Sequence, residues 1–131
     1  MSDHPDLDLV RRVYTAFAEG NATELERLFD LDVEHVVPGK HALAGTFHGR
    51  AEVLANLRTT VAATDGSLNV TVEGLFTTTT GQVIALDRSR ASRHGHTIDE
   101  PGAILFTIAH GRIIKMVEFY ADPAEIERFW A

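Results

Sequence analysis

The sequence predicts an α+β fold, with three helices packed on the concave face of a cone-shaped, curved antiparallel sheet. Two observations predict it: apolar residues recur at helical spacing in the first half of the 131 residues, and four strand-like runs fill the second half. Short links join the four runs, which favours antiparallel hairpins because a parallel crossover needs about a dozen residues or more. A bent sheet with helices across its concave side leaves a pocket between the layers.

Helical spacing marks three segments of the first half. Val13 and Phe17 lie one turn apart in the first segment, and Gly20 ends it. Asn21 and Glu24 have the spacing of a capping box, which predicts the start of a second, short helix. The predicted helices are residues 5–19, a short helix that carries Leu25, Leu28 and Phe29, and residues 50–64.

β-Branched and aromatic residues mark the strands, and turn residues mark their ends. A first strand ends at Pro38 and Gly39, and four more strands fill the second half. Asp122 and Pro123 then start a small terminal helix. The predicted strands are residues 32–37, 67–80, 82–92, 101–110 and 112–121, with residues 93–100 as a loop.

Length and composition favour a single domain over residues 1–131. Hydrophobic residues make up 44% and charged residues 24%, as in an ordinary globular protein with a buried core. A net charge of −7 argues against nucleic acid and membranes as partners, since both reward basic patches. The chain has no cysteine and no apolar signal region at its acidic N-terminus, so we expect a cytoplasmic protein.

Three segments carry a resemblance to a known family: VYTAFAEGN, VPGKHALAGTFHGRAEVL and GRIIKMVEFYADPAEIERFW. With this order of elements, they resemble the SnoaL-like polyketide cyclases of the nuclear transport factor 2-like (ketosteroid isomerase-like) superfamily. The resemblance covers nearly the whole chain. It implies a cone-shaped α+β barrel, usually dimeric, whose apolar pocket holds acid–base residues at its bottom. The superfamily also holds steroid isomerases and epoxide hydrolases, so the fold alone does not define the reaction.

The resemblance places an acidic residue of the family at Glu118, seven positions after a turn glycine. The cyclases have their acid–base aspartate there. Their partner histidine would fall at Ile104, and their asparagine before the strand-ending proline at Val37. The isomerases' oxyanion tyrosine would fall at Val13, one residue short of Tyr14, so the isomerase mechanism does not carry over.

The epoxide hydrolases of this superfamily use two aspartates and an arginine that bridges them. One aspartate position corresponds to Glu118 and the other to Asp87, but the arginine position holds Ala85. Because that arginine is missing, the resemblance favours cyclisation or isomerisation over the addition of water to an epoxide.

Strand alternation puts Glu118 on the same face as Met116 and Tyr120, opposite Lys115. Lysine prefers a face with access to water, so the face with Glu118 is expected to line the pocket. A poorly solvated carboxylate there can take up or release a proton near neutral pH. The structural alternative is that Glu118 forms an ion pair with Arg88 or Arg90.

Asp87 and His35 are the predicted partners of Glu118. If both carboxylates meet in the pocket, repulsion leaves one of them protonated and so makes an acid and a base. The alternative is an exposed Asp87 beside Arg88. His35 lies on the first strand and could shuttle a proton or orient a substrate oxygen, or it could be a hydrogen-bonded core histidine.

The remaining pocket wall follows from alternation and from the resemblance. Its two tyrosines could offer hydroxyl groups to a substrate or serve as core aromatics. We expect the pocket to include Tyr14, Val37, Ala85, Ile104, Met116 and Tyr120. His94 and His96 flank a turn glycine, which suits a solvated loop better than zinc, because zinc needs three or four converging ligands.

These observations lead to a small acid–base enzyme of the isomerase or lyase class that needs neither cofactor nor metal. Its substrate would be a hydrophobic, oxygenated polyketide, steroid or terpenoid. One alternative is water addition to an epoxide by Asp87 and Glu118, and another is a non-catalytic binding module.

The outer face of the sheet needs a cover of its own, which we expect a second copy of the chain to supply as a homodimer. In a third alternative this face is the functional surface, as in assembly domains of this fold. Its interface residues would then be Arg88, Arg90, Phe106 and Ile108.

Overall fold

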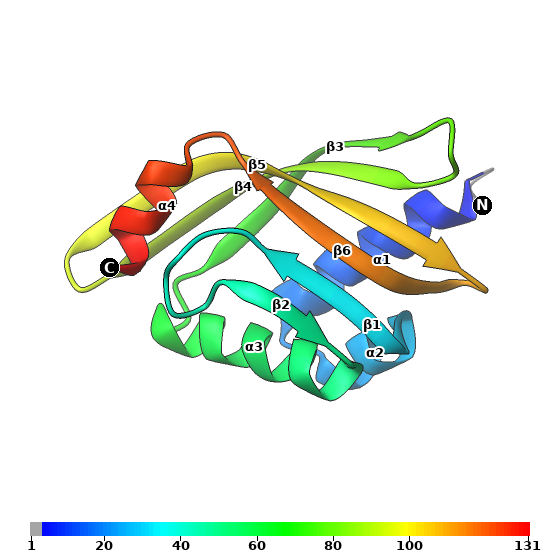
Figure 1. Ribbon diagram of the computed structural model, residues 1–131, viewed down its shortest axis with the longest axis horizontal. Coiled ribbons are helices and arrows are strands. Elements are labelled where there is room, and N and C mark those ends of the chain that lie inside the picture. The colour runs from blue at the N-terminus through cyan, green and yellow to red at the C-terminus, as the bar shows by residue number, and fades with distance from the viewer. Residues whose placement is uncertain (1–3) are drawn as a thin grey trace.

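A computed structural model describes residues 4–131, in which helices pack against one side of a six-stranded sheet (Figure 1). The strands lie in the order β2-β1-β6-β5-β4-β3 across this sheet. None of the helices described is long and apolar enough to cross a membrane. In chain order the elements are α1 (Pro5–Glu19), α2 (Ala22–Leu28), β1 (Phe29–Val37), β2 (Gly45–His48), α3 (Arg50–Ala63), β3 (Asn69–Thr77), β4 (Val83–Arg93), β5 (His96–Ala109), β6 (Arg112–Tyr120) and α4 (Pro123–Trp130).

The helices cover one side of the curved sheet. α1 packs against β3 and β4 at one edge, while α3 packs against β1 and β2 at the other. α4 lies at one end of the molecule, near the β4–β5 hairpin (Figure 1). The predicted α+β architecture is confirmed, and so are the helix caps: the side chains of Asn21 and Asp122 accept hydrogen bonds from the amides of Glu24 and Glu125.

The sheet is mixed rather than antiparallel, because β1 and β6 run parallel. The prediction of an antiparallel sheet considered only strands joined by short links, and no such link joins these two. From β1 the chain passes through β2 and α3 to the opposite edge of the sheet and returns strand by strand until β6 reaches β1. This topology places His35 directly beside Met116 of the last strand.

Several element boundaries differ from the prediction for local reasons. Phe29 begins β1 instead of ending α2, because its backbone pairs with Ile113 of β6 and its ring is buried. The short strand β2, which lacks an apolar alternation, was not predicted. The expected loop over residues 93–100 is only a turn at His94 and Gly95, both with positive φ, and β5 already starts at residue 96.

A bulge in β6 breaks the predicted alternation. Thr107 pairs with Lys115, but Ile108 pairs with Ile113, so Ile114 is the extra residue. Strict alternation would place Ile113 on the same face as Lys115. Because of the bulge, Ile113 instead points into the core and is fully buried. After the bulge, Met116 is buried on the inner face as predicted.

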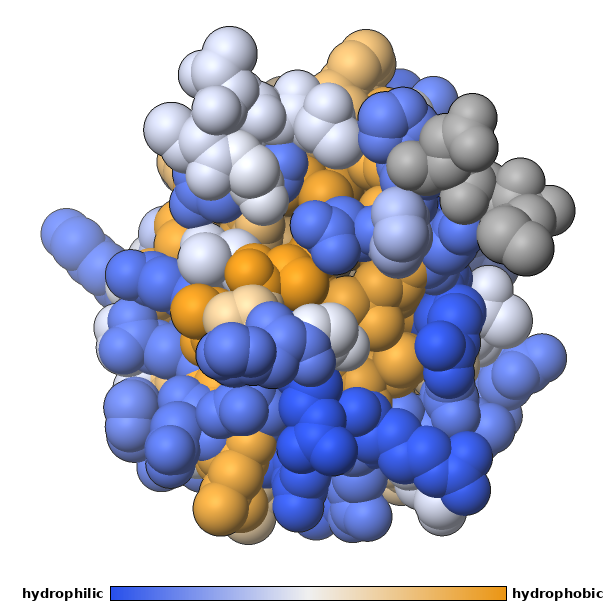
Figure 2. Space-filling model, turned by 90° about the vertical axis from the view of Figure 1, so that its right-hand side faces the viewer, coloured by the Kyte–Doolittle hydropathy of each residue, from blue (hydrophilic) through white to orange (hydrophobic). Residues whose placement is uncertain are grey.

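Two hydrophobic clusters form the interior of the described chain. The larger one lies between the sheet and helices α1 to α3, and it includes Val10, Val33, Val53 and Phe106. The smaller one joins α4 to the ends of β4 and β5. At the end of the molecule shown in Figure 2, apolar side chains reach the surface only in areas bordered by hydrophilic ones.

Candidate functional site

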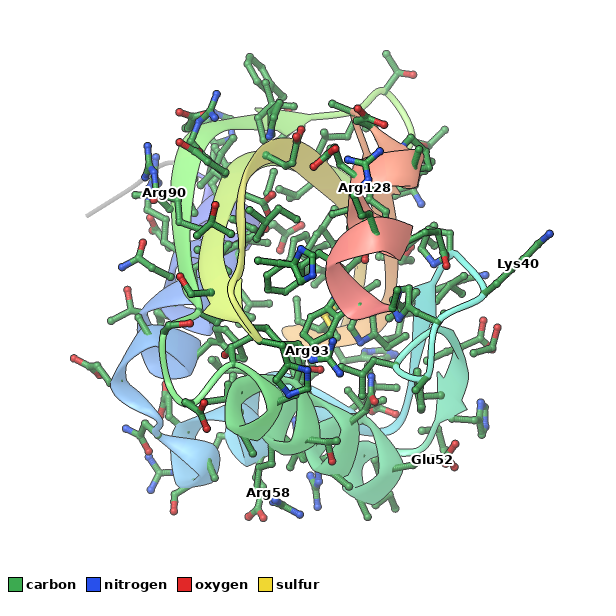
Figure 3. All side chains as sticks on the ribbon, turned by 90° about the vertical axis from the view of Figure 1, so that its left-hand side faces the viewer. Lys40, Glu52, Arg58, Arg90, Arg93 and Arg128 are labelled. Atoms are coloured by element: carbon green, nitrogen blue, oxygen red, sulfur yellow. The ribbon has the colours of Figure 1, made fainter. Side chains whose placement is uncertain are left out.

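A cavity lies between the two hydrophobic clusters, since its wall includes members of both. Its volume is about 150 Å³. Figure 3 views the end where α3, α4 and the β4–β5 hairpin surround the interior, with Arg93 between them and Lys40, Glu52 and Arg58 pointing outward. Most of the wall is apolar. Its polar side chains are Tyr14, His35, His41, Asn56, Thr60, Asp87, Ser89, Glu118 and Tyr120, together with the indole of Trp130.

A hydrogen bond joins His35 and Glu118 across the parallel strands β1 and β6. His35 lies beside Met116, and Glu118 is two residues further along on the same face. The distance between His35 Nε2 and Glu118 Oε2 is 2.6 Å. His35 is only 2% exposed, and its Nδ1 atom is buried without a hydrogen-bond partner among the described residues. The carboxylate of Glu118 thus has the imidazole of His35 as its partner inside the protein. The other ring nitrogen, Nδ1, has no partner among the described residues.

Asp87 and Tyr14 form a second pair, which joins β4 to α1. The Tyr14 hydroxyl donates a hydrogen bond of 2.8 Å to Asp87 Oδ2, and Asp87 is 6% exposed. Burial raises the pKa of Asp87 to about 6, the charges of Glu118 and Glu73 act in the same direction, and the bond from Tyr14 opposes them. Burial and the neighbouring Asp87 also raise the pKa of the Tyr14 hydroxyl. Asp87 can thus change its protonation state in the weakly acidic range.

Sheet register brings Tyr120 close to both pairs. Asp87 on β4 is paired with Gly102 on β5, which is paired in turn with Tyr120 on β6. A Cβ atom on Gly102 would lie 3.3 Å from Asp87 Oδ1 and 2.9 Å from a backbone oxygen, so only glycine fits between them. Burial and the charges of Glu118 and Asp87 raise the pKa of the Tyr120 hydroxyl, which keeps it a hydrogen-bond donor.

The structural alternatives considered for the two carboxylates are both wrong. Arg88 lies within ion-pair distance of Glu73 and Asp99 rather than of Glu118. Arg90 also pairs with Asp99. Asp87 is buried instead of lying exposed beside Arg88.

Most of the predicted pocket residues line the cavity, and one does not. Tyr14, Val37, Ile104, Met116 and Tyr120 are part of its wall. Ala85, however, is fully buried in the larger hydrophobic cluster, because α1 packs over that part of β4 and the cavity wall begins further along the strand.

The sequence analysis missed His41, which lies in the loop after β1. Its Nδ1 atom accepts a hydrogen bond from the amide of Leu43, and its ring stacks on Trp130 with 5.9 Å between ring centres. Burial lowers the pKa of His41, against the opposing charges of Glu127 and Glu118. Strand alternation does not reach a loop residue, so no pattern in the sequence pointed to it.

The described residues offer no cluster of three or more His, Asp or Glu side chains that could hold a metal ion. The polar side chains of the cavity wall include acids, bases and hydroxyl groups. Two hydrogen-bonded pairs, each with a carboxylate, face the same apolar space.

This arrangement of sheet, helices and cavity is the nuclear transport factor 2-like fold. The model of the SnoaL-like domain family matches residues 10–116, and the chain belongs to this family. An uncharacterized protein of Mycobacterium tuberculosis (strain ATCC 25618 / H37Rv) is 56% identical over the whole length of both chains.

Solved structures share the whole fold. Bal32a, from a soil-derived mobile gene cassette, is 29% identical and superposes with a TM-score of 0.94 over 97% of each chain. A nuclear transport factor 2-like protein of Burkholderia pseudomallei is 21% identical, with a TM-score of 0.86 over 100% of this chain and 99% of the other. The resemblance expected from the sequence is thus confirmed for family and fold.

Proposed function

We propose that this protein is an acid–base enzyme of the cyclase or isomerase type, acting on a hydrophobic, oxygenated small molecule. The observation that carries the proposal is the contact between His35 and Glu118 in the wall of an apolar cavity. A carboxylate in the cavity wall can reach a bound substrate, and the histidine beside it can orient it for proton transfer, as general acid–base catalysis requires.

In the proposed step, Glu118 removes a proton from a carbon next to a carbonyl group of the substrate. The electron pair of the broken C–H bond forms a C=C bond, and the carbonyl electrons move to oxygen, giving an enolate. Tyr120, or Asp87 in its protonated form, is the hydrogen-bond donor for that oxygen. If a C=C bond of the substrate is conjugated with the enolate, Glu118 can return the proton to the far carbon of that system, which gives isomerisation. Alternatively, the enolate carbon attacks a second carbonyl and forms a C–C bond, and the resulting alkoxide takes the proton back from Glu118 as the ring closes.

Water addition to an epoxide receives less support from the site. The resemblance assigns that reaction a bridging arginine, and its position holds the buried Ala85. Within the described part of the chain, no arginine or lysine lines the cavity. Asp87 and Glu118 are bonded to Tyr14 and His35 respectively, instead of sharing a bridging cation.

A non-catalytic binding module is the second candidate function. It is favoured by the apolar side chains at Val13, Val37 and Ile104, where the resemblance places catalytic partners. The two candidates differ in one measurable property, because a binder holds its ligand without exchanging protons with it.

Proton exchange with solvent tests the proposal. A panel of cyclic ketones and 1,3-diketones is incubated with the protein in deuterated buffer, and deuterium incorporation next to the carbonyl is followed by NMR. We expect exchange above the buffer rate with at least one compound, and a loss of about 100-fold in Glu118→Gln. The control Glu52→Gln changes an outward-pointing carboxylate and should keep the full rate. Unchanged exchange in Glu118→Gln would contradict the proposal.

We also propose that the chain forms a homodimer through the outer face of the sheet. Two adjacent cross-strand rows on this face are largely apolar, and three of their side chains are conspicuously exposed: Phe76 at 54%, Leu86 at 42% and Phe119 at 52%. One row holds Phe76, Ile84, Leu105, Val117 and Val36; the other holds Gly74, Leu86, Ala103 and Phe119.

An apolar surface of this kind, bordered by charged groups, is typical of an interface. Arg88, Glu73 and Asp99 border it on one side, while Lys115 and Glu34 form an ion pair on the other. A second copy offers the same rows to the first and can therefore cover them symmetrically.

The interface residues expected from the sequence need correction. Phe106 and Ile108 do not lie on the outer face: Phe106 is buried and lines the cavity, and Ile108 packs on the larger hydrophobic cluster. Arg88 and Arg90 form ion pairs on the surface at the border of the apolar rows.

A further inference from the structure

The acidic side chains of the cavity wall, Asp87 and Glu118, have no basic counterpart there: among residues 4–131 no lysine or arginine lines the cavity. The guanidinium of Arg93 lies 5.6 Å from the centre of the Trp130 ring, but it donates its hydrogen bonds to the backbone oxygens of Phe129 and Ala131. The guanidinium group of Arg93 therefore already makes hydrogen bonds within the protein.

In the pairs His35–Glu118 and Tyr14–Asp87, the polar atoms that remain without a hydrogen bond are mainly acceptors. When His35 Nε2 carries the proton shared with Glu118, the neutral ring has a lone pair at Nδ1, one of two buried ring nitrogens without a partner among the described residues. The other is Nε2 of His41, whose Nδ1 accepts from Leu43, so a neutral His41 ring donates from Nε2 and suits the oxygen of a ligand hydroxyl group. Tyr14 occupies only Oδ2 of Asp87, and the carboxylate retains Oδ1. A ligand that satisfies these acceptors must bring O–H or N–H groups of its own.

From these contacts we infer that the cavity selects hydrophobic molecules that carry a hydroxyl or ammonium group and no negative charge. This inference rests on the proposed function in taking the same cavity as the ligand site, and it adds the substrate class. Carboxylic acids and phosphate-bearing compounds are excluded from the class.

Electrostatic interactions are strong in an apolar cavity, and they favour hydroxyl and ammonium ligands over carboxylates. A carboxylate ligand would lose its water and come close to two like charges, without a cation of the protein to offset them. An ammonium group would instead meet the carboxylates and the faces of aromatic rings such as Phe106, Phe129 and Trp130. A hydroxyl group brings no charge and donates to the open acceptors.

The protein carries its own reporter for a binding test, because its only tryptophan, Trp130, lies in the cavity wall. Benzylamine, benzyl alcohol and phenylacetate share one aromatic ring and differ in the head group. Titration of Trp130 fluorescence should show binding of the amine and the alcohol, with phenylacetate at least about tenfold weaker than benzylamine. Equal or tighter binding of phenylacetate, or no response to any of the three, would overturn the inference.

Variants that remove one charge test which groups select. Asp87→Asn and Glu118→Gln should each reduce the preference for benzylamine over phenylacetate, whereas Glu52→Gln should leave it unchanged. Circular dichroism confirms that each variant is folded before it is titrated. An unchanged preference in both folded cavity variants would overturn the assignment of selectivity to the carboxylates.

The binding ratio is measured without turnover, so this test is independent of the proposed catalysis. If the expected ratio is found while Glu118→Gln still exchanges protons at the full rate, the ligand class stands and the catalytic role of Glu118 falls. If exchange depends on Glu118 but phenylacetate binds as well as benzylamine, the ligand class falls and the catalytic role stands.

Discussion

At the residue scale, each carboxylate of the cavity depends on one neighbour. Glu118 is held by a buried imidazole, and Asp87 is held by the hydroxyl of Tyr14. Both neighbours are on other elements, so each pair also joins two parts of the fold. The two neighbours differ in their hydrogen-bonding chemistry: an imidazole nitrogen can donate or accept, depending on the tautomer, whereas the tyrosine hydroxyl donates to Asp87.

Asp87 lowers the stability of the folded protein when it is ionised. Its pKa is raised by burial from 3.8 to about 6, so the folded state binds a proton more tightly than the unfolded state does. The resulting cost is fully present above about pH 6 and disappears as the pH falls toward 4. The shift corresponds to about 3 kcal/mol at most, since one pKa unit is about 1.4 kcal/mol.

Asp87→Asn should therefore stabilise the protein by roughly 1–3 kcal/mol at about pH 8 and by much less at about pH 4.5. The asparagine keeps the volume of the side chain and an oxygen that accepts from Tyr14. Urea unfolding at the two pH values measures the difference in the free energy of unfolding. A gain that is equal at both pH values would show that ionisation of Asp87 is not its source.

At the element scale, regular periodicity was enough to predict the helices and most strands, but not their exceptions. The helix over residues 5–19 is observed with those bounds, because Pro5 and Gly20 mark its ends. The bulge at Ile114 and the short strand β2 follow from pairing with other strands, which no local pattern reveals. The parallel contact of β1 with β6 is likewise a property of the whole sheet.

The site was predictable to the extent that it lies on regular strands. Alternation on β6 put Glu118 on the inner face, where it is found. For Asp87 the sequence left two positions open, in the pocket or exposed beside Arg88, and the structure places it in the cavity wall. Their partners required the tertiary structure: Tyr14 comes from a helix, and His35 reaches Glu118 only because β1 lies beside β6. His41 lies in a loop, so periodicity had no bearing on it.

At the scale of the whole molecule, the cavity and the outer face of the sheet are separate surfaces. The helices, including α4, enclose the cavity. The outer face of the sheet has no cover within the described chain and carries exposed aromatic side chains. Burial of these side chains against a second copy would release water from apolar surface, which is the main driving force for association.

The homodimer can be tested by placing a charge in the apolar rows. We expect light scattering after gel filtration to give twice the chain mass of 14.4 kDa for the wild type, and Phe119→Glu to lower it to the monomer mass. Leu31→Glu is the matched control, because Leu31 is 64% exposed but is not part of the two rows. A wild type that stays monomeric at about 100 μM, well above the Kd of a specific dimer, would contradict the proposal.

The central claim is that Glu118 holds one nitrogen of a buried imidazole and leaves the other open in a water-poor cavity. Nitrogen-15 NMR of the histidine rings tests it most directly, because the chemical shifts of Nδ1 and Nε2 show which atom carries the proton. At about pH 9, well above the ordinary pKa of a histidine, we predict a protonated Nε2 and an unprotonated Nδ1 for His35, with the exposed His94 in the turn between β4 and β5 as the reference ring. A proton on Nδ1, or a mixture of tautomers like that of His94, would contradict the account.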